Sequence, residues 1–291
     1  MEFIAIVVAL LVERFWPNIQ ALRDTHLFQK YISKCRALLG ETEALDGPVG
    51  VALLLLPALL GVAWIQELFS GGIWALFGLV YAVLVLLAAM GPRNLGGQVE
   101  GYVRAMDGRD ENRACDIAAD ILNEAVPLDE GGRDRKIIYK ILPQANDWLL
   151  AVLFWFALLG PVGAVLYRLA AHLKTECEER HENSGFASAS RVLYGLLAWV
   201  PARITSFVYG LAGSFNDAQR LAREAQQHGE GVWLANNHHI LLGSGLGALQ
   251  LHDRREPFTN HHVKQALDLI HRTAVIWLTG IAVLTLLSGL I

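Results

Sequence analysis

Charged residues are scarce in this chain. Asp, Glu, Lys and Arg make up 18% of its 291 residues, whereas about a quarter is usual in soluble domains. Only three cysteines occur, far apart and without a CxxC spacing, which favours structural thiols over disulfides or a zinc site. The net charge of −4 gives no indication of nucleic-acid binding. These shortages argue against a soluble domain, a disulfide scaffold and a nucleic-acid-binding protein.

Long uncharged runs are abundant instead. Residues 273–291 read TAVIWLTGIAVLTLLSGLI, which matches the roughly twenty apolar residues that a helix needs to cross a bilayer. Similar runs predict membrane segments at about 48–69, 71–91 and 148–171. We expect an all-α integral membrane protein, a helical bundle with three to five membrane segments. The chain is predicted to form one domain over 1–291, with cytoplasmic helical segments at 92–147 and 172–272.

The distribution of basic residues predicts the orientation of these segments. Residues 14–36 carry five Lys and Arg and residues 92–147 carry eight, whereas the connection near Ser70 carries none. Because basic loops stay on the cytoplasmic side, the first two stretches are predicted to be cytoplasmic and the connection external. The expected location is the bacterial inner membrane, with several crossings.

The third apolar segment allows two interpretations. It is interrupted by Gly160-Pro161-Val162-Gly163, where proline removes a backbone donor and glycine permits a sharp reversal. A re-entrant hairpin would keep the basic residues of 172–272 in the cytoplasm, and charge balance favours it. The alternative is a kinked crossing at 148–171, paired with a second crossing at 193–213.

Five residues are predicted to bind a ligand. Arg203 lies inside an apolar stretch, where an unpaired charge is costly and an ionisable residue usually marks a site; an interfacial anchor is the alternative. Asn146 and Asp147 open the third apolar segment, where they could also cap a helix, and Arg168 closes it. We expect Arg203 to pair with Asp147 or with Glu13, and to receive a carboxylate or phosphate. No catalytic residue and no metal ligand is predicted, and the cofactor is left open.

The last third of the chain holds two further patterns. Histidines cluster there, but without an HExxH motif, so solvated or interfacial side chains are favoured over a metal site. Gly243, Gly245 and Gly247 favour close helix packing over a nucleotide-binding loop, since no Walker lysine follows them.

Three blocks resemble the AmpE and CbiB/CobD superfamily. These are LFWFALLGPVGAVLYR at 153–168, WVPAR at 199–203 and GALQL at 247–251, and they occur in the superfamily's order. The resemblance implies one of two activities. The CbiB/CobD branch makes the aminopropanol amide of the corrin ring, and the AmpE branch is linked to induction of AmpC β-lactamase.

Departures from the enzyme branch favour AmpE. Its Asn-Thr-Leu-Asp motif falls on Ala171–Lys174, its aspartate pair falls on Tyr194 and Gly195, and its asparagine falls on Ala198. A Gly-Arg-Asp-Thr motif is absent from 110–145. The resemblance therefore implies an inner-membrane sensor or signalling modulator linked to cell-wall recycling and β-lactamase induction, without cobalamin synthase activity. Whether the chain is an enzyme is left open, and a role without catalysis is favoured.

The alternative is a membrane-embedded enzyme of altered chemistry, related to the ATP-dependent adenosylcobinamide-phosphate synthase. Transport is disfavoured because few polar residues line the apolar runs. The expected partners are the lipid bilayer, a muropeptide, nucleotide or other anionic ligand, and a protein of cell-wall recycling. No nucleic acid is expected.

Overall fold

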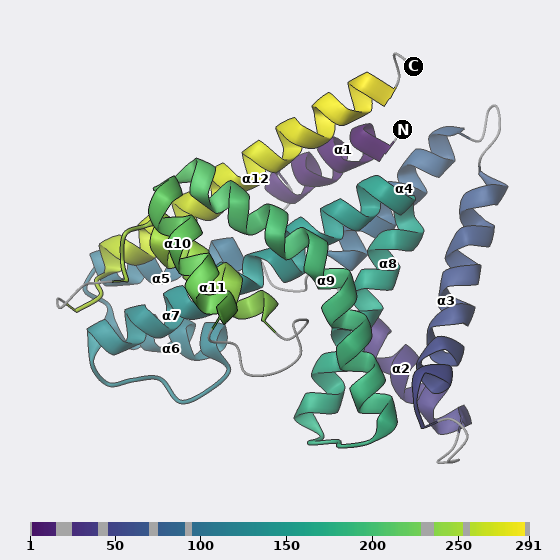
Figure 1. Cartoon of the computed structure of the whole chain (residues 1–291), viewed down its shortest axis with the longest axis horizontal. Helices are drawn as coiled ribbons and strands as arrows, with labels where there is room; N and C mark the ends of the chain where they lie inside the picture. Colours follow the sequence, from purple (N-terminus) through teal and green to yellow (C-terminus); the bar gives the residue numbers. More distant parts are fainter. Residues whose placement is uncertain are drawn as a thin grey trace. The chain divides into compact units, whose positions relative to one another are not determined.

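The computed structural model describes residues 2–15, 25–39, 46–69, 75–90, 95–227, 236–252 and 257–288, and every regular element in these ranges is helical (Figure 1). The helices in chain order are α1 (Glu2–Phe15), α2 (Thr25–Leu39), α3 (Pro48–Leu68), α4 (Ala75–Ala89), α5 (Leu95–Asp107), α6 (Glu111–Leu122), α7 (Glu130–Ala145), a π-helical turn (Asn146–Leu150), α8 (Ala151–Glu179), α9 (Gly185–Ala212), α10 (Phe215–Gln227), α11 (Asn237–Ala248) and α12 (Asn260–Ser288). The all-α prediction is confirmed.

The chain divides into two compact units. Unit 1 comprises Met1–Pro92, Ala151–Ala198 and Ser288–Ile291, and unit 2 comprises Arg93–Leu150 and Trp199–Leu287. Each unit is described by itself below.

Four helical stretches in the described residues are long and apolar enough to cross a membrane. They are Pro48–Leu68, the continuous run Glu130–Glu179, Gly185–Ala212 and Asn260–Thr285. Large apolar side chains on α3, such as Leu60 and Trp64, are exposed, as expected where lipid replaces water. The chain is therefore a multi-pass membrane protein. The segment expected at 71–91 contains the shorter α4, and the alternative crossing at 193–213 overlaps α9, which ends at Ala212.

Helix α8 is broken where the sequence predicts it. Gly160 has φ 64° and ψ −151°, a backbone conformation that glycine adopts without the clash of a Cβ. The chain turns so sharply that a Cβ at Gly163 would overlap the carbonyl oxygen of Trp155. Gly160 and Gly163 therefore allow the helical segments before and after the break to approach so closely that backbone atoms of Trp155 and Gly163 are in contact.

In unit 1, the second half of α8 runs antiparallel to α3. At one end, a Cβ on Gly160 would lie 3.4 Å from the Gln66 side chain, near the end of α3. At the other end, Asp46, just before α3, accepts hydrogen bonds from the backbone N–H groups of Gly185 (3.1 Å) and Phe186 (2.6 Å) at the start of α9. The helices share an apolar core formed by Ile32, Val51, Leu54, Leu55, Val165, Leu169 and Leu173.

In unit 2, α10 and α11 pack closely because of the glycines of α11. A Cβ on Gly243 would lie 2.9 Å from the carbonyl oxygen of Leu221, and one on Gly247 would lie 2.5 Å from that of Asp217. Side chains larger than hydrogen would push the helices apart. The close-packing interpretation of this glycine pattern is confirmed.

Candidate functional site

The site in unit 2 begins at the π-helical turn after α7. Single π turns inside α-helices are rare and occur often at functional sites, and this one contains Asn146 and Asp147. The Asn146 side chain is fully buried, and its Oδ1 accepts a hydrogen bond of 2.9 Å from the buried Thr205 hydroxyl of α9. This bond fixes the turn against α9 and so sets the position of Asp147.

Asp147 pairs with a histidine that lies 91 residues further along the chain. Its Oδ2 lies 2.8 Å from Nε2 of His238, near the start of α11. The two side chains are 20% and 44% exposed, so the pair is reachable from outside the unit.

Arg203 is held in place by two neighbours. Its guanidinium lies over the Trp199 ring at 4.2 Å, and its Nη1 donates to Asn237 Oδ1 (2.8 Å) and to the Trp199 carbonyl (3.1 Å). Its Nε and Nη2 groups make no hydrogen bond to the described residues. Three of the five N–H donors of this half-buried cation therefore have no hydrogen-bond partner among the residues that the structure describes.

The first turn of α11 joins these contacts, because Asn237 holds Arg203 and the next residue, His238, holds Asp147. We call the six residues the α11 polar cluster: Asn146, Asp147, Arg203, Thr205, Asn237 and His238. All belong to unit 2. The cluster combines a fixed cation with a carboxylate–imidazole pair, an arrangement suited to binding an anion and accepting a proton.

The structure brings three of the five predicted ligand-binding residues together. Arg203, Asp147 and Asn146 belong to the cluster, but the expected ion pair between Arg203 and Asp147 is absent. The reason is that Asn237 occupies Nη1 of Arg203, whereas His238 holds the carboxylate. Arg168 is buried in unit 1, so its proximity to Asp147 stays a prediction. The side chain of Glu13 lies outside the described residues.

Sequence reasoning missed Thr205, Asn237 and His238. Thr205 lies two residues after Arg203, and Asn237 and His238 belong to a polar Asn-Asn-His-His stretch. Nothing in these patterns indicates their partners, which are 59, 34 and 91 residues away. Within the described part of the chain, no group of three or more His, Cys, Asp or Glu side chains is placed to ligate a metal.

A second polar network in unit 2 is buried. Tyr102 donates to Asp134 (2.6 Å) and accepts from Arg133 Nε (3.1 Å). Burial raises the pKa of Tyr102, and the bond to Asp134 adds to this effect. Arg133 and Asp134 belong to one of two Gly-Arg-Asp tripeptides, the other being 108–110. Residues 132–134 thus match the first three residues of the Gly-Arg-Asp-Thr motif that was predicted to be absent from 110–145, and Arg135 stands in place of its threonine.

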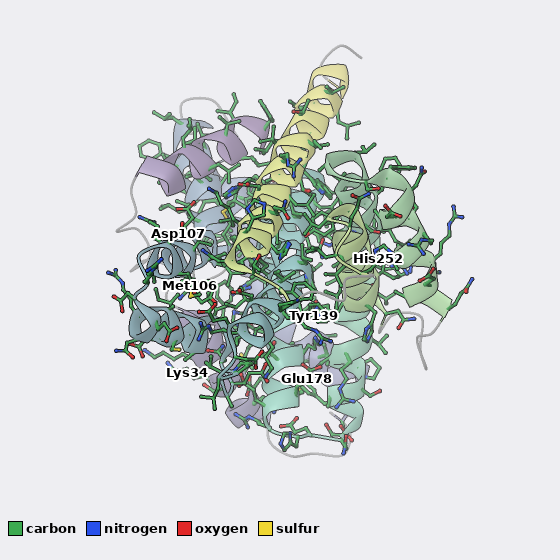
Figure 2. All side chains as sticks on the ribbon, turned by 90° about the vertical axis from the view of Figure 1, so that its left-hand side faces the viewer. Lys34, Met106, Asp107, Tyr139, Glu178 and His252 are labelled. Atoms are coloured by element: carbon green, nitrogen blue, oxygen red, sulfur yellow. The ribbon has the colours of Figure 1, made fainter. Side chains whose placement is uncertain are left out.

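Other polar surfaces of unit 2 lie apart from the cluster. A cavity of about 450 Å³ is lined by residues that include Met106, Asp107, Glu130 and Lys264. Figure 2 shows Met106 and Asp107 together on α5, away from His252. No residue of the α11 polar cluster lines this cavity.

The fold defines a multi-pass helical membrane protein with a polar cluster in unit 2. The family model described as "CobD/Cbib protein" matches residues 6–240. The chain belongs to the CobD/CbiB family.

The relatives found support this family. A protein of Stutzerimonas stutzeri named cobalamin biosynthesis protein CobD is 29% identical over 253 residues, which cover 80% of each chain. A protein of the same name from Chromobacterium violaceum is 32% identical over 209 residues, covering 70% of this chain and 63% of the relative. One from Pelobacter propionicus is 28% identical, covering 62% and 57% respectively. No solved structure matches the chain.

These relatives overturn the AmpE interpretation. The relatives found are named for cobalamin biosynthesis, and none of those named above carries the name AmpE. The predicted role in signalling and β-lactamase induction was wrong. It rested on substitutions at a few positions, and those substitutions do not change the family.

Proposed function

We propose that this chain is a membrane-embedded enzyme of cobalamin biosynthesis, related to the ATP-dependent adenosylcobinamide-phosphate synthase but with altered chemistry. The family match over residues 6–240 carries the proposal. The resemblance then implies amide formation between a corrin carboxylate and an amine, with ATP supplying the driving force.

The α11 polar cluster supports this proposal through its chemistry. Carboxylates and phosphates accept two parallel hydrogen bonds from a guanidinium. The Nε and Nη2 groups of Arg203 could donate these bonds, because its bonds to described residues use Nη1. Trp199 and Asn237 hold the guanidinium still, so less side-chain freedom is lost when an anion binds. In this proposal Arg203 binds the carboxylate or phosphate group of the substrate.

Altered chemistry is proposed from what replaces the enzyme branch's polar residues. Lys174 Nζ lies 4.7 Å from the centre of the Tyr194 ring and 3.6 Å from a Glu178 oxygen. At the positions where the resemblance expects aspartates, this chain thus has a cation–π contact in unit 1. Neither Lys174 nor Tyr194 can supply the carboxylate oxygens of those aspartates, so the activating and binding groups must differ.

The ligand and the location follow from the same proposal. Without the AmpE interpretation, a muropeptide and a partner in cell-wall recycling have no support left. A nucleotide or another anionic ligand remains the class that Arg203 suits. Apolar helices imply contact with lipid, and we propose the bacterial inner membrane, with residues 95–147 in the cytoplasm.

Expression in a bacterium that lacks its own CobD protein tests the proposal. Corrinoids extracted from these cells would be compared by mass spectrometry with those of cells carrying an empty vector. We expect a corrinoid acid to be consumed and a product to appear whose added mass identifies the amine. The Arg203→Ala variant should lose this product, and the exposed control Arg104→Ala should keep it. An unchanged corrinoid pool, with the protein present in the membrane fraction, would contradict the proposal.

A further inference from the structure

We infer that the cavity between α5, α7 and α12 in unit 2 binds a small molecule that carries both an ammonium group and an anionic group. The cavity has a volume of about 450 Å³, and sites for small molecules span roughly 300–1,000 Å³. Its charged lining residues are Asp107 at the end of α5, Glu130 at the start of α7 and Lys264 in α12. Such a site goes beyond the proposed function, because no residue of the α11 polar cluster lines this cavity.

Charges of opposite sign line the cavity without pairing with each other. Asp107 and Glu130 contribute two carboxylates and Lys264 contributes an ammonium group, and all three residues are exposed. Lys264 makes no hydrogen bond or ion pair with either acid, or with any other residue that the structure describes. A ligand that carries both charges could pair with the lysine and with the acids at the same time.

Glu130 is not needed to cap the helix that it begins. An acidic residue beside a helix start often accepts a hydrogen bond from the first-turn N–H groups. In α7 the preceding residue, Asp129, does this, because its Oδ2 accepts from the Gly132 N–H at 2.6 Å. Glu130 makes no hydrogen bond or ion pair among the described residues. Its carboxylate is therefore available to a cation in the cavity.

The walls of the cavity are held together by polar and close backbone contacts. Asn260, the first residue of α12, donates to the Asp107 carboxylate (2.8 Å) and to the Val103 carbonyl (3.3 Å). Figure 2 shows Asp107 beside this end of the yellow helix α12. A Cβ on Gly131 would lie 2.9 Å from the Cβ of Pro257, so the start of α7 packs directly against the segment before α12. A preformed site loses less conformational freedom when its ligand binds.

The two ends of the ligand follow from the groups that line the cavity. An ammonium group donates up to three hydrogen bonds, and it suits Glu130 together with Asp107, whose Oδ1 alone is used by Asn260. The anionic end suits Lys264 and the first turn of α12. N–H groups in a first turn have no acceptor within the helix, and the helix dipole favours a negative charge there. A phosphate or a carboxylate meets this requirement.

A free molecule fits this position better than a lipid head group does. Phosphatidylethanolamine carries the same two charges, but its head group stays at the bilayer surface. Residues 260–272 of α12 separate the cavity from the uncharged run that begins at Thr273. At 1.5 Å per residue this is about 20 Å of helix. The ligand is therefore assigned to the water-soluble small molecules.

Calorimetry on the full-length protein, reconstituted in phosphatidylcholine nanodiscs, tests the site. O-phosphoethanolamine and β-alanine carry both charges, whereas ethanolamine and ethyl phosphate carry one each. We expect wild type to bind at least one of the first two with a Kd of about 1 mM or tighter. Its affinity for that probe should be about tenfold higher than for either singly charged probe.

Variants separate the two ends of the site. Lys264→Ala should lower the affinity for the doubly charged probe about tenfold and leave that for ethanolamine unchanged. Glu130→Gln should lower both affinities by a similar factor. The control Lys136→Ala, whose half-exposed lysine pairs with Glu124 outside the cavity, should bind as wild type does. Loss of folding cannot produce this split, and binding at Arg203 would not respond to Lys264.

Three outcomes would overturn parts of this inference. The site is rejected if wild type binds neither doubly charged probe more tightly than ethanolamine, or if Lys264→Ala binds as wild type does. If nanodiscs that contain phosphatidylethanolamine abolish binding of the free probe, the charge pairing stands and the ligand is the lipid head group. None of these measurements depends on corrinoid conversion, so rejection of the site leaves the proposed function standing.

Discussion

Arg36 and Glu182, which are 146 residues apart in the chain, form a two-pronged ion pair in unit 1. Nη1 donates to Oε1 at 2.7 Å, and Nη2 donates to Oε2 at 2.9 Å. Arg36 also lies over the Phe186 ring, at 4.5 Å. The pair ties the end of α2 to the connection between α8 and α9, next to the contacts that Asp46 makes with the start of α9. The start of α3 and the α8–α9 connection therefore lie at the same end of unit 1.

This relationship predicts the side of the membrane on which the α8–α9 connection lies. Basic-residue counts put 14–36 in the cytoplasm, so the connection should be cytoplasmic as well. In a chain without its native cysteines, a cysteine at Asn183 should resist a membrane-impermeant maleimide in intact spheroplasts. A cysteine at Glu67, at the other end of α3, should react. Labelling of the Asn183 position from outside would reject the re-entrant arrangement of α8.

The same ion pair predicts a pH-dependent loss of stability. The hydrogen bonds from Arg36 lower the pKa of Glu182. A lowered folded-state pKa stabilises the fold above the unfolded value of about 4.3, and this contribution disappears as pH falls through the lower folded-state pKa. At pH 7, Glu182→Gln should cost roughly 0.5–1 kcal/mol. Thermal unfolding in detergent should show the difference from wild type shrinking below about pH 4.

The control for this effect is Glu124→Gln. Glu124 lies 3.6 Å from Lys136, and both side chains are about half exposed, so solvent screens the pair. We expect Glu124→Gln to leave the thermal unfolding temperature unchanged, both at pH 7 and below about pH 4. An equal loss of thermal stability in Glu182→Gln and Glu124→Gln would show that the two-pronged geometry of the Arg36–Glu182 pair does not stabilise the fold.

Arg203→Lys should weaken anion binding without unfolding the protein. Lysine keeps the charge but loses the planar fork that a carboxylate or phosphate can match. The affinity for ATP, measured by calorimetry in nanodiscs, should fall about tenfold, which corresponds to about 1.4 kcal/mol. The control Arg104→Lys, at a 75% exposed side chain, should bind as wild type does. Unchanged affinity in Arg203→Lys would show that the arginine is an interfacial anchor.

Thr205→Val should destabilise unit 2. It removes the donor to Asn146 and leaves a buried amide oxygen without that partner, at a cost of about 1–3 kcal/mol. Thermal unfolding measures the loss. Thr279→Val is the matched control, because its exposed hydroxyl donates to the Val275 carbonyl of its own helix and to no other described residue. Equal melting temperatures for the two variants would contradict the importance of the buried bond.

Gly163→Ala should prevent the close approach between the α8 segments before and after the Gly160 break. The new methyl group would overlap the Trp155 carbonyl oxygen, and backbone atoms cannot move aside as a flexible side chain can. We expect a loss of at least about 2 kcal/mol, or failure to accumulate in the membrane. Gly61→Ala, in the middle of α3 with no atom within 4 Å of the new Cβ, should be neutral or stabilising by up to about 1 kcal/mol.

Several parts of the fold were predictable because their signals are local. Uncharged runs of about twenty residues predict spanning helices whatever their neighbours are. Gly160 and Pro161 predict a helix break from backbone geometry alone. The glycines of α11 likewise predict close packing. The position of Arg203 in an apolar stretch made it a candidate site residue, which stays a prediction.

The partners of these residues depend on long-range contacts. The sequence suggested an acid for Arg203, yet the amide of Asn237 is the group that reaches it, and the predicted acid bonds to His238 instead. A helix positions side chains three or four residues apart, but nothing local brings residue 147 next to residue 238. The substitutions at Tyr194 and Gly195 indicated a change of family that the comparisons contradict, because a site can change while its scaffold stays the same.

The sequence by itself therefore determined the membrane class, the helical content, the break in α8 and the unusual arginine, since each follows from hydrophobicity or backbone sterics within a short stretch. Only the tertiary structure decided that the π-helical turn, α9 and α11 together form a polar cluster. The physical reason is that the bonds of Arg203, Asn146 and Asp147 exist only once the packing of three separate helices has brought their partners within hydrogen-bonding distance.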